Sequence, residues 1–222
     1  MVSDYFNYDI DSLDHVIPDL EVDSIINNDW GLHTYDNPTY VAHNDVFTDD
    51  EISKIIFAGK NSACDLGTVG TNNGFEVDPS IRKSKVSWLQ ANPFNSWIYQ
   101  RLTEYVNRSN DDHWQYDLRA IQTLQFSEYD SRYEGQYVSH IDSTFGYNLK
   151  TEDRKVSFSI QLSDPDDYEG GELLLNHGND CVVSKTKGSM TLFPSFTVHE
   201  VKPVTKGIRY SLVGWVVGEK FK

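Results

Sequence analysis

The amino-acid sequence predicts an α+β protein whose C-terminal part is a sandwich or jelly roll covered on one face by helices. Two stretches with a helical period come first, and from residue 118 onward the period changes to two. The chain has 222 residues, of which 38% are hydrophobic and 13% aromatic. This is enough to bury a core, and the length fits one domain better than two.

The start of the chain differs in composition from the rest. Residues 1–40 are rich in Asp, Asn and Tyr and show no sustained period. We therefore expect an acidic N-terminal arm that is irregular or packs as isolated strands. A single domain then covers residues 41–222, with its jelly-roll core at about 118–218.

The first helix is predicted by the segment FTDDEISKIIFAGK, residues 47–60. Thr48 and Glu51 have the spacing of a capping box, and the isoleucines that follow fall on one helical face. Gly59 is placed to end this helix.

A loop and a second helix follow. Residues 60–80 contain three glycines among Asn, Asp and Ser, so they predict a long loop of the lid or binding kind. Residues 92–109 predict the helix, with Asn92 as N-cap and Pro93 at the first helical position. Its apolar stripe, which indicates core packing, is Phe94, Trp97, Ile98, Leu102, Tyr105 and Val106.

The C-terminal half alternates between apolar and polar residues, as half-buried strands do. Turns rich in Gly, Pro, Asp and Asn separate the alternating segments. The predicted strands are residues 119–129, 155–163, 171–176, 189–194, 196–201 and 208–218.

Charge and cysteine content exclude several classes of partner and site. The 19 basic and 34 acidic residues give a net charge of −15, which repels phosphate backbones, so we expect no nucleic-acid partner. Two cysteines provide neither a disulfide framework nor a CxxC zinc site. No apolar run reaches transmembrane length, and the first residues lack the features of a secretory signal. We expect a cytoplasmic protein without a membrane partner.

Two histidine–aspartate pairs have a spacing that suits a metal. His140 and Asp142 lie two apart in a predicted strand, where side chains point the same way. The spacing alone is weak, because His43 and Asp45 repeat it in a predicted loop before the first helix. His199, on a later predicted strand, offers a third ligand to the first pair. Two histidines and one carboxylate with open positions are diagnostic of non-haem iron(II) oxygenases.

The residues after His199 add a candidate anion site. A turn that contains Pro and Gly leads into the next strand, and together they predict a β-hairpin. Arg209 and Ser211 share one face of that strand and are placed to project into the same cavity as His199. An arginine there offers a bidentate clamp for a carboxylate ligand.

These residues carry a resemblance to a known family. The motifs are HID at 140–142, LSDPDDYEGGEL at 162–173, FPSFTVHEVKPVTKGIRYSLVGW at 193–215 and IRKSKVSWL at 81–89. Over about residues 40–218 the chain resembles the iron(II)- and 2-oxoglutarate-dependent dioxygenases, in the prolyl 4-hydroxylase-like branch. The resemblance implies a double-stranded β-helix, which is a jelly roll, with the N-terminal helices packed on one sheet.

The resemblance also implies roles for the metal and cosubstrate residues. His140, Asp142 and His199 would hold Fe(II), and Arg209 would bind the distal carboxylate of 2-oxoglutarate. Ser211 matches the serine of an R-x-S pattern and is expected to assist.

A tyrosine is also expected to reach this carboxylate. Tyr129 resembles the tyrosine of the family, but the loop here is longer by one residue, which leaves the role open between Tyr129 and Tyr133. We prefer Tyr129 because it ends a predicted strand.

Three further residues match positions near the substrate in the family: Arg82, Trp88 and Arg154. Each also has a plainer interpretation. Trp88 alternates with Val86 as a core residue does, and the two arginines are compatible with solvated surface charges. The loop at 60–80 precedes Arg82 and is placed to close over a peptide.

The implied activity is the hydroxylation of prolyl residues in a peptide or protein. Fe(II), 2-oxoglutarate and O2 take part, ascorbate is the expected reductant, and succinate and CO2 are the co-products. The alternatives are the same chemistry on another side chain, a free amino acid or a small metabolite. A nucleobase-repair oxygenase is disfavoured by the charge, and the non-enzymatic alternative is a jelly-roll binding module. The oligomeric state does not follow from the sequence.

Overall fold

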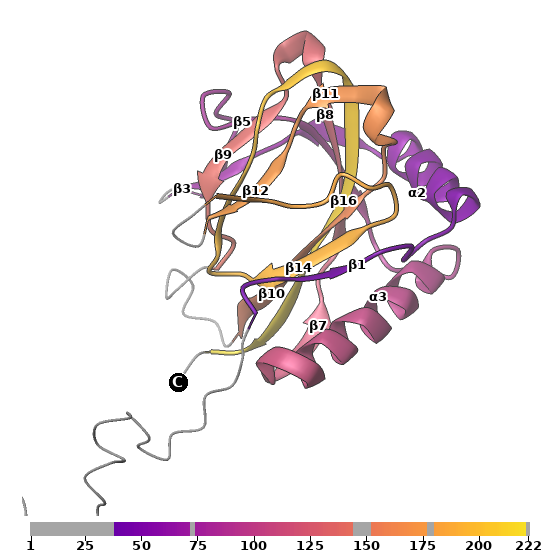
Figure 1. Ribbon diagram of the computed structural model, residues 1–222, viewed down its shortest axis with the longest axis vertical. Helices are drawn as coiled ribbons and strands as arrows, with labels where there is room; N and C mark the ends of the chain where they lie inside the picture. Colours follow the sequence, from indigo (N-terminus) through magenta and orange to yellow (C-terminus); the bar gives the residue numbers. More distant parts are fainter. Residues whose placement is uncertain (1–37, 72–73, 144–151, 177–179, 221–222) are drawn as a thin grey trace, which may run out of the picture. The chain divides into compact units, whose positions relative to one another are not determined.

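The computed structural model describes residues 38–71, 74–143, 152–176 and 180–220. The arm expected at residues 1–40 lies outside these ranges except for its last residues. Residues 37–222 form one compact unit. Two antiparallel sheets face each other within this unit (Figure 1).

The larger sheet has nine strands and contains most of the predicted ones. They are β1 (Val41–His43), β2 (Cys64–Leu66), β6 (Lys85–Leu89), β7 (Leu118–Ile121), β8 (Leu124–Asp130), β10 (Glu152–Gln161), β11 (Tyr168–Gly170), β14 (Met190–Pro194) and β16 (Val204–Glu219). The order is β1-β14-β10-β16-β8-β6-β2, and both β7 and β11 also pair with β16. The long strand β16 is therefore central to this sheet.

The smaller sheet carries the two predicted metal-binding histidines. Its strands are β5 (Arg82–Lys83), β9 (Gln136–His140), β12 (Leu173–Asn176), β13 (Asp180–Val182) and β15 (Val198–Val201). The order is β13-β12-β15-β9-β5. All six segments that the sequence predicts as strands contain at least one strand.

The predicted hairpin between His199 and Arg209 is wrong. His199 lies on β15 in the smaller sheet, whereas Arg209 lies on β16 in the larger one. The short link between the two strands carries the chain from one sheet to the other. His199 and Arg209 consequently reach the interior from separate sheets instead of from neighbouring strands.

The first helix, α2 (Asp49–Asn61), begins as the sequence predicts. The Thr48 side chain accepts a hydrogen bond from the Glu51 backbone, and the Glu51 side chain accepts one from the Thr48 backbone. The helix does not end at Gly59, which was the expectation, but continues to Asn61. Gly59 is needed for another reason, because a Cβ there would lie 2.3 Å from the ring of Phe126.

The second helix, α3 (Ser96–Ser109), begins later than the prediction from Asn92. The Asn92 side chain caps a separate turn, where its Oδ1 accepts hydrogen bonds from the backbone of Phe94 and Asn95. Phe94 is 91% exposed and does not belong to the core stripe. A π-helical turn (Asn110–Trp114) follows α3 directly.

Residues 60–80 are not the long loop that the sequence predicts. They contain β2 and the pair β3 (Val69–Thr71) and β4 (Gly74–Glu76), which form a two-stranded sheet. Strand β2 pairs with β6 and extends the larger sheet. Backbone pairing, which a composition rich in Gly and Asn does not reveal, orders this segment.

The helices cover one face of the larger sheet, as predicted (Figure 1). One hydrophobic cluster joins helices to strands and includes Ile52, Ile55, Ile98, Leu102, Leu124, Phe126, Phe158, Leu192 and Leu212. A second cluster includes Tyr129, Tyr168, Leu175, Phe193 and Val201 from the two sheets. No helix in the described part of the chain is long and apolar enough to cross a membrane.

Candidate metal centre and its surroundings

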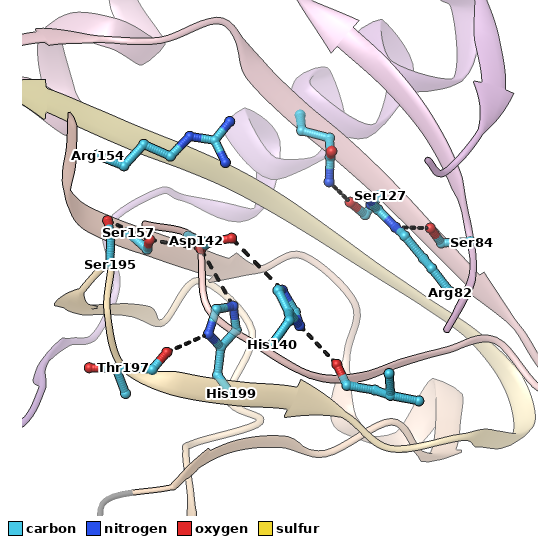
Figure 2. Close-up of polar contacts among 12 residues, drawn as sticks. Arg82, Ser84, Ser127, His140, Asp142, Arg154, Ser157, Ser195, Thr197 and His199 are labelled. Carbon is cyan, nitrogen blue, oxygen red and sulfur yellow. Dashed lines mark hydrogen bonds and ion pairs between the residues drawn. The ribbon is translucent and has the colours of Figure 1, made fainter. Parts of the chain in front are cut away.

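The structure brings His140, Asp142 and His199 together. His140 ends β9 and pairs in register with His199 on β15, while Asp142 follows two residues after His140. One ligand atom from each of the three residues lies within 4.8 Å of the others. Figure 2 shows the two imidazoles converging on the carboxylate. Pairing of β9 with β15 therefore places the two histidines, whereas Asp142 lies beyond the end of β9 and not in the strand predicted for it.

Backbone carbonyls orient the two imidazoles. The Nδ1 of His140 lies 2.8 Å from the carbonyl oxygen of Val138, and the Nδ1 of His199 lies 2.9 Å from that of Thr197. Because a carbonyl only accepts, each Nδ1 carries the proton. Each Nε2 is then left with a lone pair that faces Asp142, at 3.8 Å for His140 and 3.4 Å for His199. This tautomer is the one that a metal ligand of this kind needs.

Two serines hold the carboxylate of Asp142. The Ser157 hydroxyl donates to Oδ2 of Asp142 at 2.8 Å, and the Ser195 hydroxyl lies 2.9 Å from that of Ser157. The backbone N–H groups of Asp142 and Ser143 both donate to the Ser195 carbonyl at 2.9 Å. Position and orientation of the carboxylate are thus fixed by β10 and by the turn after β14.

The protonation states suit a divalent metal. Burial, together with the neighbouring His199, lowers the pKa of His140 to about 4, so its imidazole is neutral at pH 7. Burial alone would raise the pKa of Asp142, but the two histidines hold it below the ordinary value. Neutral imidazoles and an ionised carboxylate are the forms that bind metal. With two imidazoles and one carboxylate, the donor set fits Fe(II).

The second H-x-D pair is part of the packing between β1 and α3. His43 is hydrogen-bonded to the Ser109 hydroxyl at 2.8 Å, and its ring lies 4.9 Å from that of Tyr105. Within the described ranges, the triad is the one cluster of three residues suited to a metal. These contacts agree with a structural role for His43, which ends β1 and does not lie in the predicted loop.

Arg209 lies buried on the face of β16 that points between the sheets. It is 3% exposed, pairs in register with Tyr129 on β8, and its guanidinium lies 5.5 Å from the Tyr129 ring centre. Ser211 is also buried, and its Oγ has no hydrogen-bond partner. None of the ion pairs among the described residues includes Arg209. This buried cation is therefore available to an anionic ligand.

The two candidate tyrosines lie in different surroundings. Tyr129 faces Arg209, whereas the Tyr133 hydroxyl donates to the Glu128 carbonyl at 3.3 Å. Burial raises the pKa of Tyr133, and the charge of Glu128 raises it further. The contact with Arg209 favours Tyr129 as the cosubstrate residue.

Two residues near Arg209 were not identified from the sequence. Gln161 and Tyr168 line the same cavity as Arg209, and the Gln161 amide donates to the Tyr168 hydroxyl at 2.8 Å. Burial raises the pKa of Tyr168, and the nearby Arg209 opposes this. Tyr168 belongs to the motif LSDPDDYEGGEL, where its sequence position suggests only a turn.

A groove of about 400 Å³ opens beside the metal centre. Its lining is Trp88, Gln90, Gln122, Thr123, Arg154 and Trp215. The Arg154 guanidinium lies 3.9 Å from a Trp215 ring centre, and its Nε donates to Gln122 at 2.9 Å. Trp88 is 44% exposed, so the interpretation as a core residue is wrong. Trp215 is a further groove residue, and sequence reasoning did not single it out.

Arg82 is not the surface charge of the plainer interpretation. It is 7% exposed, on β5, and its guanidinium lies 4.7 Å from the ring centre of Tyr137. The Tyr137 ring in turn stacks on His140 with 3.6 Å between ring centres. Arg82 therefore approaches the metal centre from the β5 edge of the smaller sheet.

A known family model matches part of the chain. Residues 124–217 match the model of the 2OG-Fe(II) oxygenase superfamily. This stretch contains the whole triad, together with Arg209 and Tyr129. The resemblance to the iron(II)- and 2-oxoglutarate-dependent dioxygenases is confirmed.

Curated relatives are similar over part of their length. A PKHD-type hydroxylase of Gloeothece citriformis is 43% identical over 100 residues, which are 44% of this chain and 44% of that protein. Another, of Synechococcus elongatus, is 39% identical over 127 residues, which are 54% of this chain and 56% of that protein. The chain spans about half the length of the curated relatives it matches.

Solved structures share the fold at low sequence identity. A prolyl-4-hydroxylase of Pseudomonas putida has a TM-score of 0.62 at 17% identity, over 89% of this chain and 99% of that one. A prolyl hydroxylase of Trichoplax adhaerens, in complex with a hypoxia inducible factor peptide fragment, has a TM-score of 0.64 at 16% identity. It covers 96% of this chain and 94% of that one. The predicted jelly roll with its helices on one sheet is confirmed.

Proposed function

We propose that this chain, which resembles the 2OG-Fe(II) oxygenases of the prolyl 4-hydroxylase-like branch, hydroxylates prolyl residues in a peptide or protein. The observation that carries the proposal is the combination of the triad with a buried Arg209 that forms no ion pair among the described residues. The names of the curated relatives and of the solved structures support a hydroxylase. The peptide bound to the Trichoplax protein supports a peptide substrate.

His140, Asp142 and His199 would hold Fe(II) on one side and leave its other positions to ligands. When bound, Fe(II) and 2-oxoglutarate supply the oxidising chemistry. One oxygen atom of O2 enters a substrate C–H bond and the other enters succinate, while 2-oxoglutarate loses CO2. The protein contributes fixed ligands, a bound and oriented cosubstrate, and a site from which water is largely excluded. Ascorbate would serve as the reductant.

Arg209 would bind the distal carboxylate of 2-oxoglutarate. A guanidinium offers two parallel N–H donors to a carboxylate, and the buried position strengthens the interaction. The hydroxyls of Tyr129 and Ser211 are the additional donors on the same interior face. Ser211 has an unpaired buried Oγ that a ligand oxygen would satisfy.

The groove beside the metal centre is the proposed binding site for the substrate chain. Trp88 and Trp215 offer aromatic surfaces on which a proline ring packs well. Arg154 stacks on Trp215 in this groove, and Figure 2 shows its guanidinium on the side of the triad where Asp142 lies. Its guanidinium is placed to donate to a backbone carbonyl of the bound peptide.

The test is turnover by the full-length protein. Fe(II), 2-oxoglutarate, ascorbate and a panel of proline-containing peptides should give succinate, together with the gain of one oxygen on proline by mass spectrometry. Reactions without peptide, and reactions with a chelator, serve as controls. If oxygen is instead gained on another side chain, a free amino acid or a small metabolite, that compound would be the substrate class in place of a prolyl residue. If the protein binds metal but forms no succinate with any candidate substrate, the non-enzymatic alternative, a jelly-roll binding module, is supported instead.

A further inference from the structure

Arg82 has one guanidinium nitrogen without a partner although the side chain is buried. Its Nε donates to the Ser84 hydroxyl at 2.7 Å, and its Nη1 donates to the Thr68 carbonyl at 3.3 Å. Its Nη2 is buried and has no hydrogen bond. Buried donors are nearly always satisfied in folded proteins, so an unpaired one indicates a missing partner.

The surroundings hold this guanidinium in one position. A Cβ on Gly67 would lie 2.5 Å from the Nε of Arg82 and 2.4 Å from the Ser84 hydroxyl, so only glycine fits beside the side chain. The Tyr137 ring covers the guanidinium at 4.7 Å. Figure 2 shows Arg82 with Ser84 on the side of the metal centre away from Ser157. The unpaired nitrogen is therefore preorganised for a ligand.

No carboxylate in the described ranges neutralises Arg82. None of the ion pairs found there includes it. The internal segments outside those ranges, residues 72–73, 144–151 and 177–179, contain neither Asp nor Glu. A buried cation without a counter-charge is costly, and an arriving anion removes that cost.

Tyr137 connects this cation to the reaction site. One face of its ring lies against the Arg82 guanidinium, and the ring is stacked on the His140 imidazole with 18° between the planes. Arg82 belongs to the smaller sheet and Arg209 to the larger one. The centre is thus flanked by two buried arginines without an acidic partner in the described ranges, and 2-oxoglutarate accounts for only one of them.

We propose that Arg82 is a specificity-determining residue that binds a carboxylate of the substrate. The substrate is then an acid whose carboxylate lies close to the carbon that is hydroxylated. A free carboxylic acid and the Asp or Glu side chain of a peptide share this chemistry. The inference rests on the proposed function, because it names the class of substrate that the same site accepts.

The experiment uses two matched pairs of probes with the full-length protein. N-acetylproline and N-acetylprolinamide differ in one carboxylate, and so do blocked peptides with Pro-Glu and Pro-Gln. For each pair we would measure oxygen gain under turnover, and binding by calorimetry to protein loaded with Mn(II) and 2-oxoglutarate. The acid should be preferred roughly ten- to hundred-fold in one pair, as expected for a hydrogen bond to charged groups. The pair in which the acid is preferred shows whether the carboxylate belongs to a free acid or to a peptide side chain.

Arg82→Gln should bring the ratio of acid to amide close to one. This ratio separates recognition from a structural role, because partial unfolding lowers the rates for both probes alike. Lys83→Gln is the matched control, since it removes a neighbouring cation that pairs with Glu134 at the surface, and it should keep the ratio. If Arg82→Gln does not fold, Arg82→Lys replaces it. This variant should give a ratio of acid to amide below that of the wild type, because lysine lacks the forked N–H donors of the guanidinium.

The outcomes separate the two proposals. Equal use of acid and amide in both pairs overturns the inference. A preference that survives both Arg82 substitutions overturns it as well. Preferential binding of an acid without oxygen gain upholds the carboxylate site and removes the prolyl chemistry.

Discussion

The Ser157 hydroxyl donates a 2.8 Å hydrogen bond to Oδ2 of Asp142, so a strand of the larger sheet orients a ligand supplied beside the smaller one. Residues that orient metal ligands typically contribute 10- to 100-fold to metal affinity. Ser157→Ala should therefore weaken Mn(II) binding by roughly that factor, measured by titration without cosubstrate. Ser159→Ala, two residues along β10, is the control. Equal affinity for the two variants would contradict the role of Ser157.

Removal of a triad residue should have a larger effect than removal of Ser157. His140→Ala and Asp142→Ala should each abolish turnover and lower Mn(II) affinity by more than Ser157→Ala does, because a ligand is lost. The melting temperature should show that the fold is retained. His43→Ala is the matched control from the other H-x-D pair and should bind metal normally. Activity in both triad variants would show that other residues hold the metal.

Arg209 should determine the requirement for 2-oxoglutarate. Arg209→Ala leaves a buried carboxylate without its charged partner, so the apparent KM for 2-oxoglutarate should rise at least roughly tenfold. Tyr129→Phe should raise it by less, and Tyr133→Phe should leave it unchanged because that hydroxyl is used by the Glu128 carbonyl. An effect of Tyr133→Phe alone would reverse the assignment of the two tyrosines. Steady-state succinate assays at varied 2-oxoglutarate give these values.

Local signals in the sequence predicted local structure well. The Thr48–Glu51 capping box is present, and all six alternating segments contain strands. The expectation that His140 and Asp142 share a strand face was wrong for Asp142, because β9 ends at His140 and the backbone of Asp142 is held by the Ser195 carbonyl instead. The structure brings His199 to that pair because β15 lies beside β9.

Features set by distant contacts were missed or misread. The turn after His199 has hairpin composition, yet the chain changes sheets there, which no local pattern encodes. Gly59 fits a helix end, but the ring of Phe126 is the reason for glycine. The burial of Arg82 and the exposure of Trp88 depend on how the sheets are stacked, which neither the charge of Arg82 nor the alternation of Trp88 with Val86 reveals.

Gly59 allows a test of that contact. Alanine normally stabilises a helix interior relative to glycine by about 1 kcal/mol. Here a Cβ would meet the Phe126 ring at 2.3 Å, so Gly59→Ala should lower the free energy of unfolding, by about 1–3 kcal/mol as for an overpacked core. Urea unfolding measures the change, and Phe57→Ala, at a side chain 70% exposed on the same helix, should change little. A stabilised Gly59→Ala would mean that the ring has room to move.

The capping box should contribute stability that depends on pH. Thr48→Ala should lower the free energy of unfolding by about 1 kcal/mol at neutral pH, because a helix N–H loses its acceptor. The hydrogen bond from the Thr48 backbone holds the pKa of Glu51 below its ordinary value, and Arg101 contributes in the same direction. Since the folded pKa is the lower one, the Glu51 contribution is fully present above the unfolded pKa of about 4.3.

That contribution should be lost as the pH falls through the folded pKa of Glu51. The stability difference between wild type and Glu51→Gln should accordingly be constant between pH 6 and 7, and should shrink below about pH 4. Glu104→Gln, at an exposed glutamate of α3, is the control for a change of charge alone. Urea unfolding at several pH values measures both differences. A wild-type advantage that stays the same down to pH 3 would show that the Glu51 carboxylate does not act through its charge.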